Sequence, residues 1–101
     1  MTISALLSFA ALLVTVSAHE YGFHKNWPEL PDGIKNIGDS HGEIDVDSAG
    51  LIYVSVMGGD KHGIQIYSAA GKYLRNLPNA MDNHHGFSIV RENGKDYLFA
   101  A

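Results

Sequence analysis

The chain matches itself without a gap at an offset of 44 residues, and this self-match restricts the possible folds more than any other feature. The pair His-Gly opens both copies, at His41 and at His85, and each pair precedes a run typical of a β-strand. The matched positions are His41/His85, Gly42/Gly86, Val46/Val90, Gly50/Gly94, Tyr53/Tyr97 and Val54/Leu98. A fixed period of about 40–45 residues is typical of repeat architectures. The sequence therefore predicts repeated structural units.

Strand-like runs alternate with turn signals inside one period. These runs are rich in β-branched and aromatic residues, and they cover residues 43–47, 51–56, 63–67 and 72–77. Turn-forming residues separate them at 48–50 and 68–71, and a longer polar loop spans 57–62. The second copy supplies two more runs between residues 86 and 101. We therefore predict an all-β fold with one complete four-stranded antiparallel unit and part of a second.

The stretch HGEIDVDSAGLIYVSV, followed by GIQIYSAAGKYLRNL, resembles an NHL-type repeat. The shared pattern is an apolar inner strand, an Asp and Gly turn, an aromatic-Val strand, an Ile-Gln-Ile-aromatic strand and a Gly-Lys turn. The resemblance covers residues 41–77 well and 85–101 in part, so residues 41–101 are expected to be NHL-type repeats. It implies a secreted six-bladed β-propeller, similar to the amidating-lyase and NHL-containing propellers of bacteria and animals. Such a ring needs about six periods, so the chain is expected to be an N-terminal fragment.

The segment 1–18 carries no charged side chain and ends on the small-x-small pattern Val16-Ser17-Ala18. These features predict a cleaved signal peptide, helical before cleavage, and a secreted or periplasmic protein without stable membrane insertion after cleavage. An uncleaved anchor is the alternative, because the usual Lys or Arg of the n-region is missing. The apolar run is shorter than the roughly 20 residues of a membrane span. Residues 19–40 match no repeat, and the sequence predicts an irregular lead-in there.

The composition restricts the classes of partner. Of the residues, 46% are hydrophobic and 18% are charged, and the net charge of -4 comes without a basic stripe. This balance is that of an ordinary globular protein and argues against nucleic-acid binding. The chain has no cysteine, so its stability must come from a larger packed architecture or from a partner. The expected partner is a protein or a small-molecule ligand of unknown identity.

His41 and His85 are the candidate metal ligands. The first strand of each blade lines the central channel of a propeller, so both imidazoles would face the axis, and neutral imidazole is a common transition-metal ligand. The resemblance to amidating-lyase propellers implies zinc or another divalent metal there. The alternative is that each histidine bonds a neighbouring backbone carbonyl and marks the repeat. Neighbouring residues of an extended chain point to opposite sides, so only one of His84 and His85 can face the channel. The self-match selects His85, and His84 is expected to be a loop residue that points away from it.

Other motifs indicate little chemistry. The stretch Asp45–Gly50 begins like a calcium loop but lacks the later ligands, and MGGDKH at 57–62 is not followed by a helix that could hold phosphate. An N-terminal His19 can chelate copper after cleavage, but that chemistry belongs to another fold. The catalytic residues are unknown, because no Ser-His-Asp, Cys-His or paired-carboxylate arrangement stands out. The two remaining hypotheses are a binding or scaffold module without catalysis and a metal-dependent lyase or hydrolase that uses His41 and His85.

Overall fold

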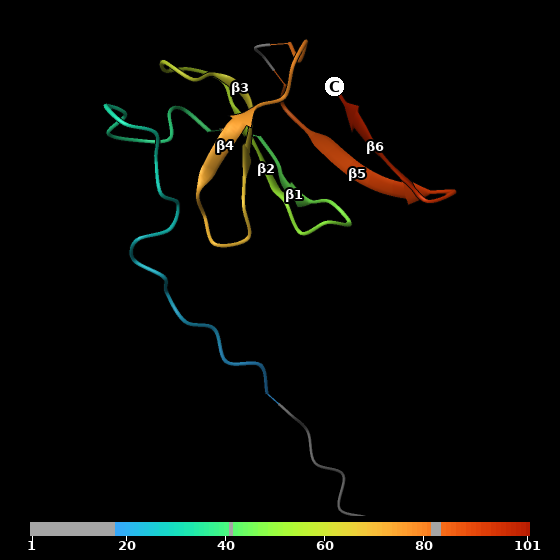
Figure 1. Cartoon of the computed structure of the whole chain (residues 1–101), viewed down its shortest axis with the longest axis horizontal. Coiled ribbons are helices and arrows are strands. Elements are labelled where there is room, and N and C mark those ends of the chain that lie inside the picture. The colour runs from blue at the N-terminus through green and yellow to red at the C-terminus, as the bar shows by residue number, and fades with distance from the viewer. Residues whose placement is uncertain (1–17, 41, 82–83) are drawn as a thin grey trace, which may run out of the picture.

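A computed structural model describes residues 18–40, 42–81 and 84–101. These residues form six β-strands and no helix, so the all-β prediction is confirmed for this part of the chain (Figure 1). The strands are β1 (Ile44–Val46), β2 (Ile52–Val56), β3 (Gly63–Tyr67), β4 (Tyr73–Asn76), β5 (Phe87–Glu92) and β6 (Lys95–Ala100). Among the described residues, no helix is long and apolar enough to cross a membrane. The predicted signal helix lies outside the described residues, except for Ala18.

The first sheet is an antiparallel meander in the order β1-β2-β3-β4, as the four strand-like runs of one period predict. The turn between β1 and β2 is held by Asp47, whose Oδ1 accepts hydrogen bonds from the backbone N–H groups of Ala49 and Leu51, both at 2.9 Å. Gly50 supplies the positive φ of 82° that this turn needs. The predicted hairpin turn at 48–50 is therefore present.

The register of the first sheet gives it two distinct faces. Val54, Val56 and Tyr67 form a buried cluster on what we call the lead-in face, together with the partly buried Ile37, Ile52 and Tyr73. What we call the hairpin face carries Asp45, Tyr53, Ser55, Ile64 and Ile66, which the register places opposite one another. Ile64 and Ile66 are fully buried, so both faces are covered.

The lead-in covers the first of these faces. The Glu29 N–H donates to the Gly71 carbonyl in the β3–β4 turn at 2.6 Å. The Asp39 N–H donates to the Gly58 carbonyl in the β2–β3 loop at 3.1 Å. Just before Glu29, the Trp27 ring packs on the Tyr67 ring, with 5.9 Å between the centroids. The lead-in therefore lies across the lead-in face and closes part of the core.

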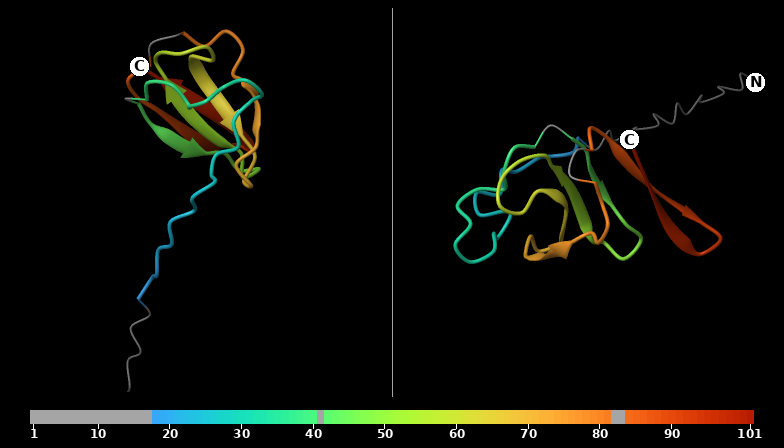
Figure 2. Two further views of the ribbon diagram at one scale, coloured as in Figure 1. Left: turned by 90° about the vertical axis from the view of Figure 1, so that its left-hand side faces the viewer. Right: turned by 90° about the horizontal axis from the view of Figure 1, so that it is seen from above.

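The second sheet is the hairpin β5–β6, which packs against the hairpin face. The Ile89 N–H donates to the Asp45 carboxylate at 2.6 Å, and the Ser55 hydroxyl donates to the His84 carbonyl at 2.7 Å. Figure 2 shows the lead-in and β5–β6 on opposite sides of the first sheet. The described residues thus form three successive layers: lead-in, first sheet and hairpin.

The two copies of the repeat differ in turn length. Glu92 pairs with Lys95 across the two-residue turn Asn93-Gly94, whereas the β1–β2 connection has three residues, 48–50, inside the Asp47-Leu51 closure. As a result Tyr97 lies opposite Val90, while the matching Tyr53 lies opposite Asp45. The gapless match therefore holds for each strand separately, and the cross-strand partners shift by one residue.

The turn of the second hairpin leads to a prediction. Asn93 and Gly94 have φ values of 50° and 77°, and no atom lies within 4 Å of a Cβ built on Gly94. Gly94→Ala should therefore lower the free energy of unfolding by about 1 kcal/mol through backbone strain alone. Gly94→Asn should cost clearly less, because asparagine tolerates the left-handed region. Urea denaturation of the three proteins measures both effects, and equal losses in the two variants would contradict this reason.

Candidate functional site

The structure places one of the two candidate metal ligands. His41 lies outside the described residues. His85 is exposed, and its backbone N–H donates to the Ala101 carbonyl at 3.1 Å. Within the described ranges, no group of three or more His, Asp or Glu side chains is arranged to hold a metal ion. A metal at His85 would therefore need ligands from residues beyond those described.

The neighbouring His84 is the buried member of the histidine pair. It is a loop residue as expected, but only 7% of its surface is exposed, and its Nδ1 has no hydrogen-bond partner among the described residues. Its carbonyl oxygen accepts the Ser55 hydroxyl, which fixes this segment to the hairpin face. Strand alternation does not identify the buried histidine, because β5 begins only at Phe87.

A close backbone approach surrounds Ser55. A Cβ added to Gly42 would lie 2.5 Å from the Ser55 Cβ and 3.2 Å from the His84 carbonyl oxygen. The Ser40 hydroxyl donates to the Ser55 carbonyl at 2.9 Å. A close backbone approach is thus present at Gly42, whereas Gly86 has no atom within 4 Å of an added Cβ. Sequence reasoning missed Ser55, which occupies an ordinary strand position.

The Ser55 hydroxyl is not arranged as a nucleophile. It donates its proton to the His84 carbonyl oxygen, and a serine nucleophile needs a base such as imidazole at that position. Ser55 is 1% exposed, so a substrate would not reach its Oγ without rearrangement. Ser40, Gly42, Ser55 and His84 therefore hold the segment before β5 on the first sheet, and they provide no triad chemistry.

Two shallow pockets flank the lead-in. One of about 310 Å³ lies between residues 33–37 and the loop residues 59–61, and one of about 220 Å³ is lined by residues 29–32, Lys72 and Tyr73. Gln65 connects the two sides of the larger pocket. Its Nε2 donates to the carbonyls of Ile37 and Lys61, at 3.1 and 2.8 Å. Its size is at the lower end for a small-molecule site.

A buried tyrosine fixes the orientation of this glutamine. The Tyr67 hydroxyl donates to the Gln65 Oε1 at 2.5 Å. Burial, with a smaller effect of the Tyr73 phenol, raises the pKa of Tyr67 to about 12, so the phenol remains a neutral donor at neutral pH. The pair was not evident from the sequence, because Gln65 lies inside a buried strand and its partners come from distant segments.

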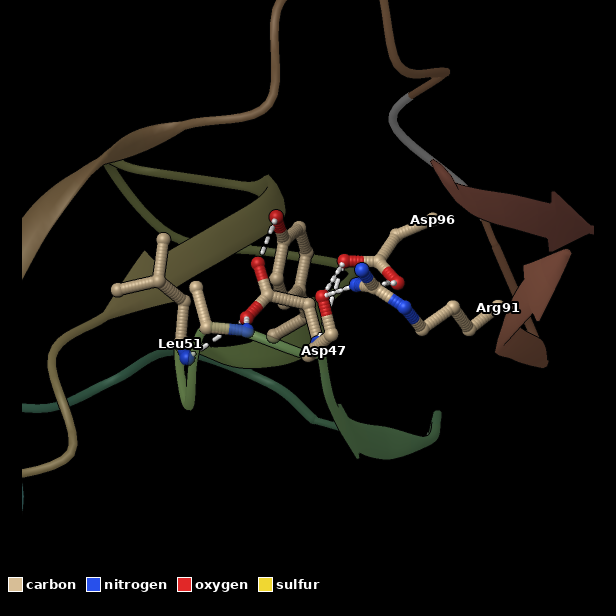
Figure 3. A network of polar contacts seen from close by, with 7 residues as sticks. Asp47, Leu51, Arg91 and Asp96 are labelled. Carbon is tan, nitrogen blue, oxygen red and sulfur yellow. Dashed lines mark hydrogen bonds and ion pairs between the residues drawn. The ribbon is translucent and has the colours of Figure 1, made fainter. Parts of the chain in front are cut away.

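The carboxylates of the calcium-like stretch already have protein donors. Asp45 accepts the N–H groups of Val46 and Ile89, at 2.8 and 2.6 Å. Asp47 accepts two backbone N–H groups of the turn and the Tyr53 hydroxyl, the latter at 3.1 Å (Figure 3). These two carboxylates therefore stabilise the β1–β2 turn and its contact with β5 through hydrogen bonds within the protein.

The comparisons with known proteins add no family to this description. No family model, no curated protein and no solved structure matches the chain. The function is therefore inferred from the chain's own residues and their geometry.

Proposed function

We propose that residues 41–101 are NHL-type propeller units and that the chain is the N-terminal part of a secreted, six-bladed β-propeller that acts as a binding or scaffold module. One observation carries the proposal: a four-stranded antiparallel meander is followed by a second hairpin that stacks on it one period later. Ile89 follows Asp45 by 44 residues, the period of the self-match, and its N–H contacts the Asp45 carboxylate directly. Stacked blades place the inner strands of neighbouring units side by side in this way.

The end of the sheets that carries the long loops is the proposed binding surface. The loop 57–62 and the chain that follows β4 from Leu77 leave the first sheet at the same end, because β2 and β4 run in the same direction. His62, His84 and His85 lie in these segments, and the pocket of about 310 Å³ borders the first of them. Loops on a rigid sheet scaffold are where binding residues concentrate. The structural use of Ser55, Asp45 and Asp47 favours binding over catalysis.

The alternative is a metal-dependent lyase or hydrolase that holds zinc or another divalent ion with His41 and His85. The observation in its favour is that His85 is exposed and uses only its backbone in the hydrogen bonds of the described residues. Its imidazole is therefore available to an axial ion. Zinc needs three or four ligands at about 2.0–2.1 Å from nitrogen, so further ligands would have to come from other units.

Metal analysis of the protein produced from its complete reading frame distinguishes the two functions. A binding module should contain no stoichiometric metal, and His41→Ala and His85→Ala should leave both metal content and folding unchanged. His62→Ala serves as a matched control on the same end of the sheets. One bound metal per wild-type chain that is lost in both His41→Ala and His85→Ala, but kept in His62→Ala, would overturn the binding-module proposal in favour of the enzyme.

A further inference from the structure

The turn ends of the two sheets meet through polar groups. We call this contact the joint, and it consists of Asp45 and Ser48 from the first sheet and Ile89, Arg91 and Asp96 from the second. Figure 3 shows Arg91 and Asp96 beside the β1–β2 turn. The opposite end of the same interface holds the buried side chains of Phe87 and Ile64, beside the hydrogen bond from the Ser55 hydroxyl to the His84 carbonyl. The hairpin β5–β6 is thus anchored at its two ends by different sets of contacts.

Three carboxylate contacts hold the joint. The Asp45 Oδ2 accepts the Ile89 N–H at 2.6 Å. The Asp96 Oδ2 accepts the hydroxyl and the backbone N–H of Ser48, at 2.5 and 3.2 Å. The Arg91 guanidinium reaches both Ser48 and the Asp96 Oδ1, the latter at 3.5 Å. Because Arg91 and Asp96 face each other across β5 and β6, the hairpin presents a preformed ion pair to the Ser48 turn.

The charge state of the two carboxylates sets the strength of these contacts, because hydrogen bonds to an ionised carboxylate are stronger than those to a protonated carboxyl group. The Ile89 N–H, followed by the Val46 N–H, lowers the pKa of Asp45, and the Ser48 hydroxyl is the largest cause that lowers the pKa of Asp96. A carboxyl with a lowered pKa in the folded state contributes stability above its unfolded value, and this contribution is lost as the pH falls through the folded value. The contribution of these two carboxylates to the joint is therefore present at neutral pH and is lost as the pH falls below about 4.

The other charged groups near the joint are few. Asp47 and Tyr53 belong to the β1–β2 hairpin, and Arg75 on β4 acts on the Tyr53 phenol, whose pKa is raised mainly by burial. Glu43 lies two residues before Asp45, while Glu92 and Lys95 close the β5–β6 turn. The side chains of Arg91 and Asp96 are 55% and 26% exposed. An ion pair this exposed is screened by salt.

We propose that the joint is a latch that holds the turn end of β5–β6 against the first sheet and that releases it in acid or in high salt while the first sheet stays folded. The opposite end around Phe87 acts as the pivot. The first sheet keeps its turn through the hydrogen bonds of Asp47 and its core through Val54, Val56 and Tyr67, whose side chains lie on the lead-in face. The proposal concerns this contact alone and does not depend on the ring or on its ligand.

Distance measurements between spin labels test the latch. The chain has no cysteine, so Ala49→Cys with Lys95→Cys labels the two sides of the joint, and Ala49→Cys with Ala70→Cys labels the first sheet alone. The labels sit on the complete chain, with or without its signal segment. The first pair should show one short distance at neutral pH, and a longer, broader population should appear in about 1 M salt or near pH 3. The second pair should not change.

Substitutions separate the latch from general unfolding. Asp96→Asn and Arg91→Ala should raise the open population about two- to fivefold at neutral pH, the range expected for the loss of one exposed charged contact. Glu92→Gln changes a neighbouring charge that makes no joint contact, and it should have no effect. An unchanged joint distance in Asp96→Asn and Arg91→Ala, or broadening of both label pairs at the same pH, would overturn the proposal.

Discussion

Tyr67→Ala should lower the free energy of unfolding by about 3–5 kcal/mol. Tyr67 is fully buried, packs against Trp27 from the lead-in and Tyr73 from β4, and anchors the Val54 and Val56 cluster. Its removal opens a cavity between the lead-in and the first sheet, and neither side can collapse without losing its backbone hydrogen bonds. Since small domains are stable by only about 5–15 kcal/mol, urea denaturation followed by circular dichroism should show a large fall in the midpoint.

Tyr67→Phe is the matched control, because it keeps the ring and removes only the hydroxyl. It should cost about 1–3 kcal/mol, since the Gln65 Oε1 is left buried without its donor. The pKa of Tyr67, raised to about 12 by burial, adds a second readout. An unfolded tyrosine ionises near pH 10, so the unfolded state loses its proton first, and the wild type should lose stability as the pH rises from about 10 to 12. Tyr67→Phe should lack this part of the loss. Equal stability of Tyr67→Ala and wild type would show that the aromatic cluster is not part of the core.

The strands could be predicted from sequence because their turns are encoded locally. The run Gly63–Tyr67 agrees with β3 residue for residue, and Ser68, Gly71 and Lys72 close the next turn through local hydrogen bonds. Alternation and β-branched side chains then fix which residues pair. The first sheet followed from such local signals alone.

The packing of the lead-in could not be predicted in the same way. Trp27 meets Tyr67 across 40 residues of sequence, and Gln65 bonds to Ile37 across 28. No period or motif marks such pairs, because long-range contacts depend on how the segments fold over the sheet. The same reason explains why Gln65 resembled any other strand residue in the sequence.

The metal site at His41 and His85 stays a prediction, since His41 lies outside the described residues. The self-match selected His85, but the structure buries His84, because a bend at residue 85 precedes β5 and the Ser55 hydroxyl fixes the preceding carbonyl. The self-match also did not reveal the difference in turn length between 48–50 and Asn93-Gly94, because a gapless comparison assumes equal lengths. Equal residue types at equal spacing thus did not guarantee equal surroundings.

Gly42→Ala and Gly86→Ala test this inequality directly, because the two glycines occupy matching positions. A methyl group on Gly42 would lie 2.5 Å from the Ser55 Cβ and 2.6 Å from its Oγ, whereas one on Gly86 meets nothing within 4 Å. Gly42→Ala should therefore lower the free energy of unfolding by about 1–3 kcal/mol. Gly86→Ala should leave it within about 0.5 kcal/mol of the wild type or raise it slightly, since alanine restricts the unfolded chain.

A Ser55→Gly background shows whether crowding at Ser55 is the cause. Ser55→Gly removes both atoms that the new methyl group would meet, so Gly42→Ala should cost clearly less in that background than in the wild type. Urea denaturation of the four proteins of this cycle, together with Gly86→Ala, gives the coupling energy. Equal costs of the alanine at Gly42 and at Gly86, or no coupling between Gly42 and Ser55, would mean that the two glycines have the same surroundings. The expected inequality instead makes Gly42 part of the contact between the sheets, whereas Gly86 has room for a methyl group.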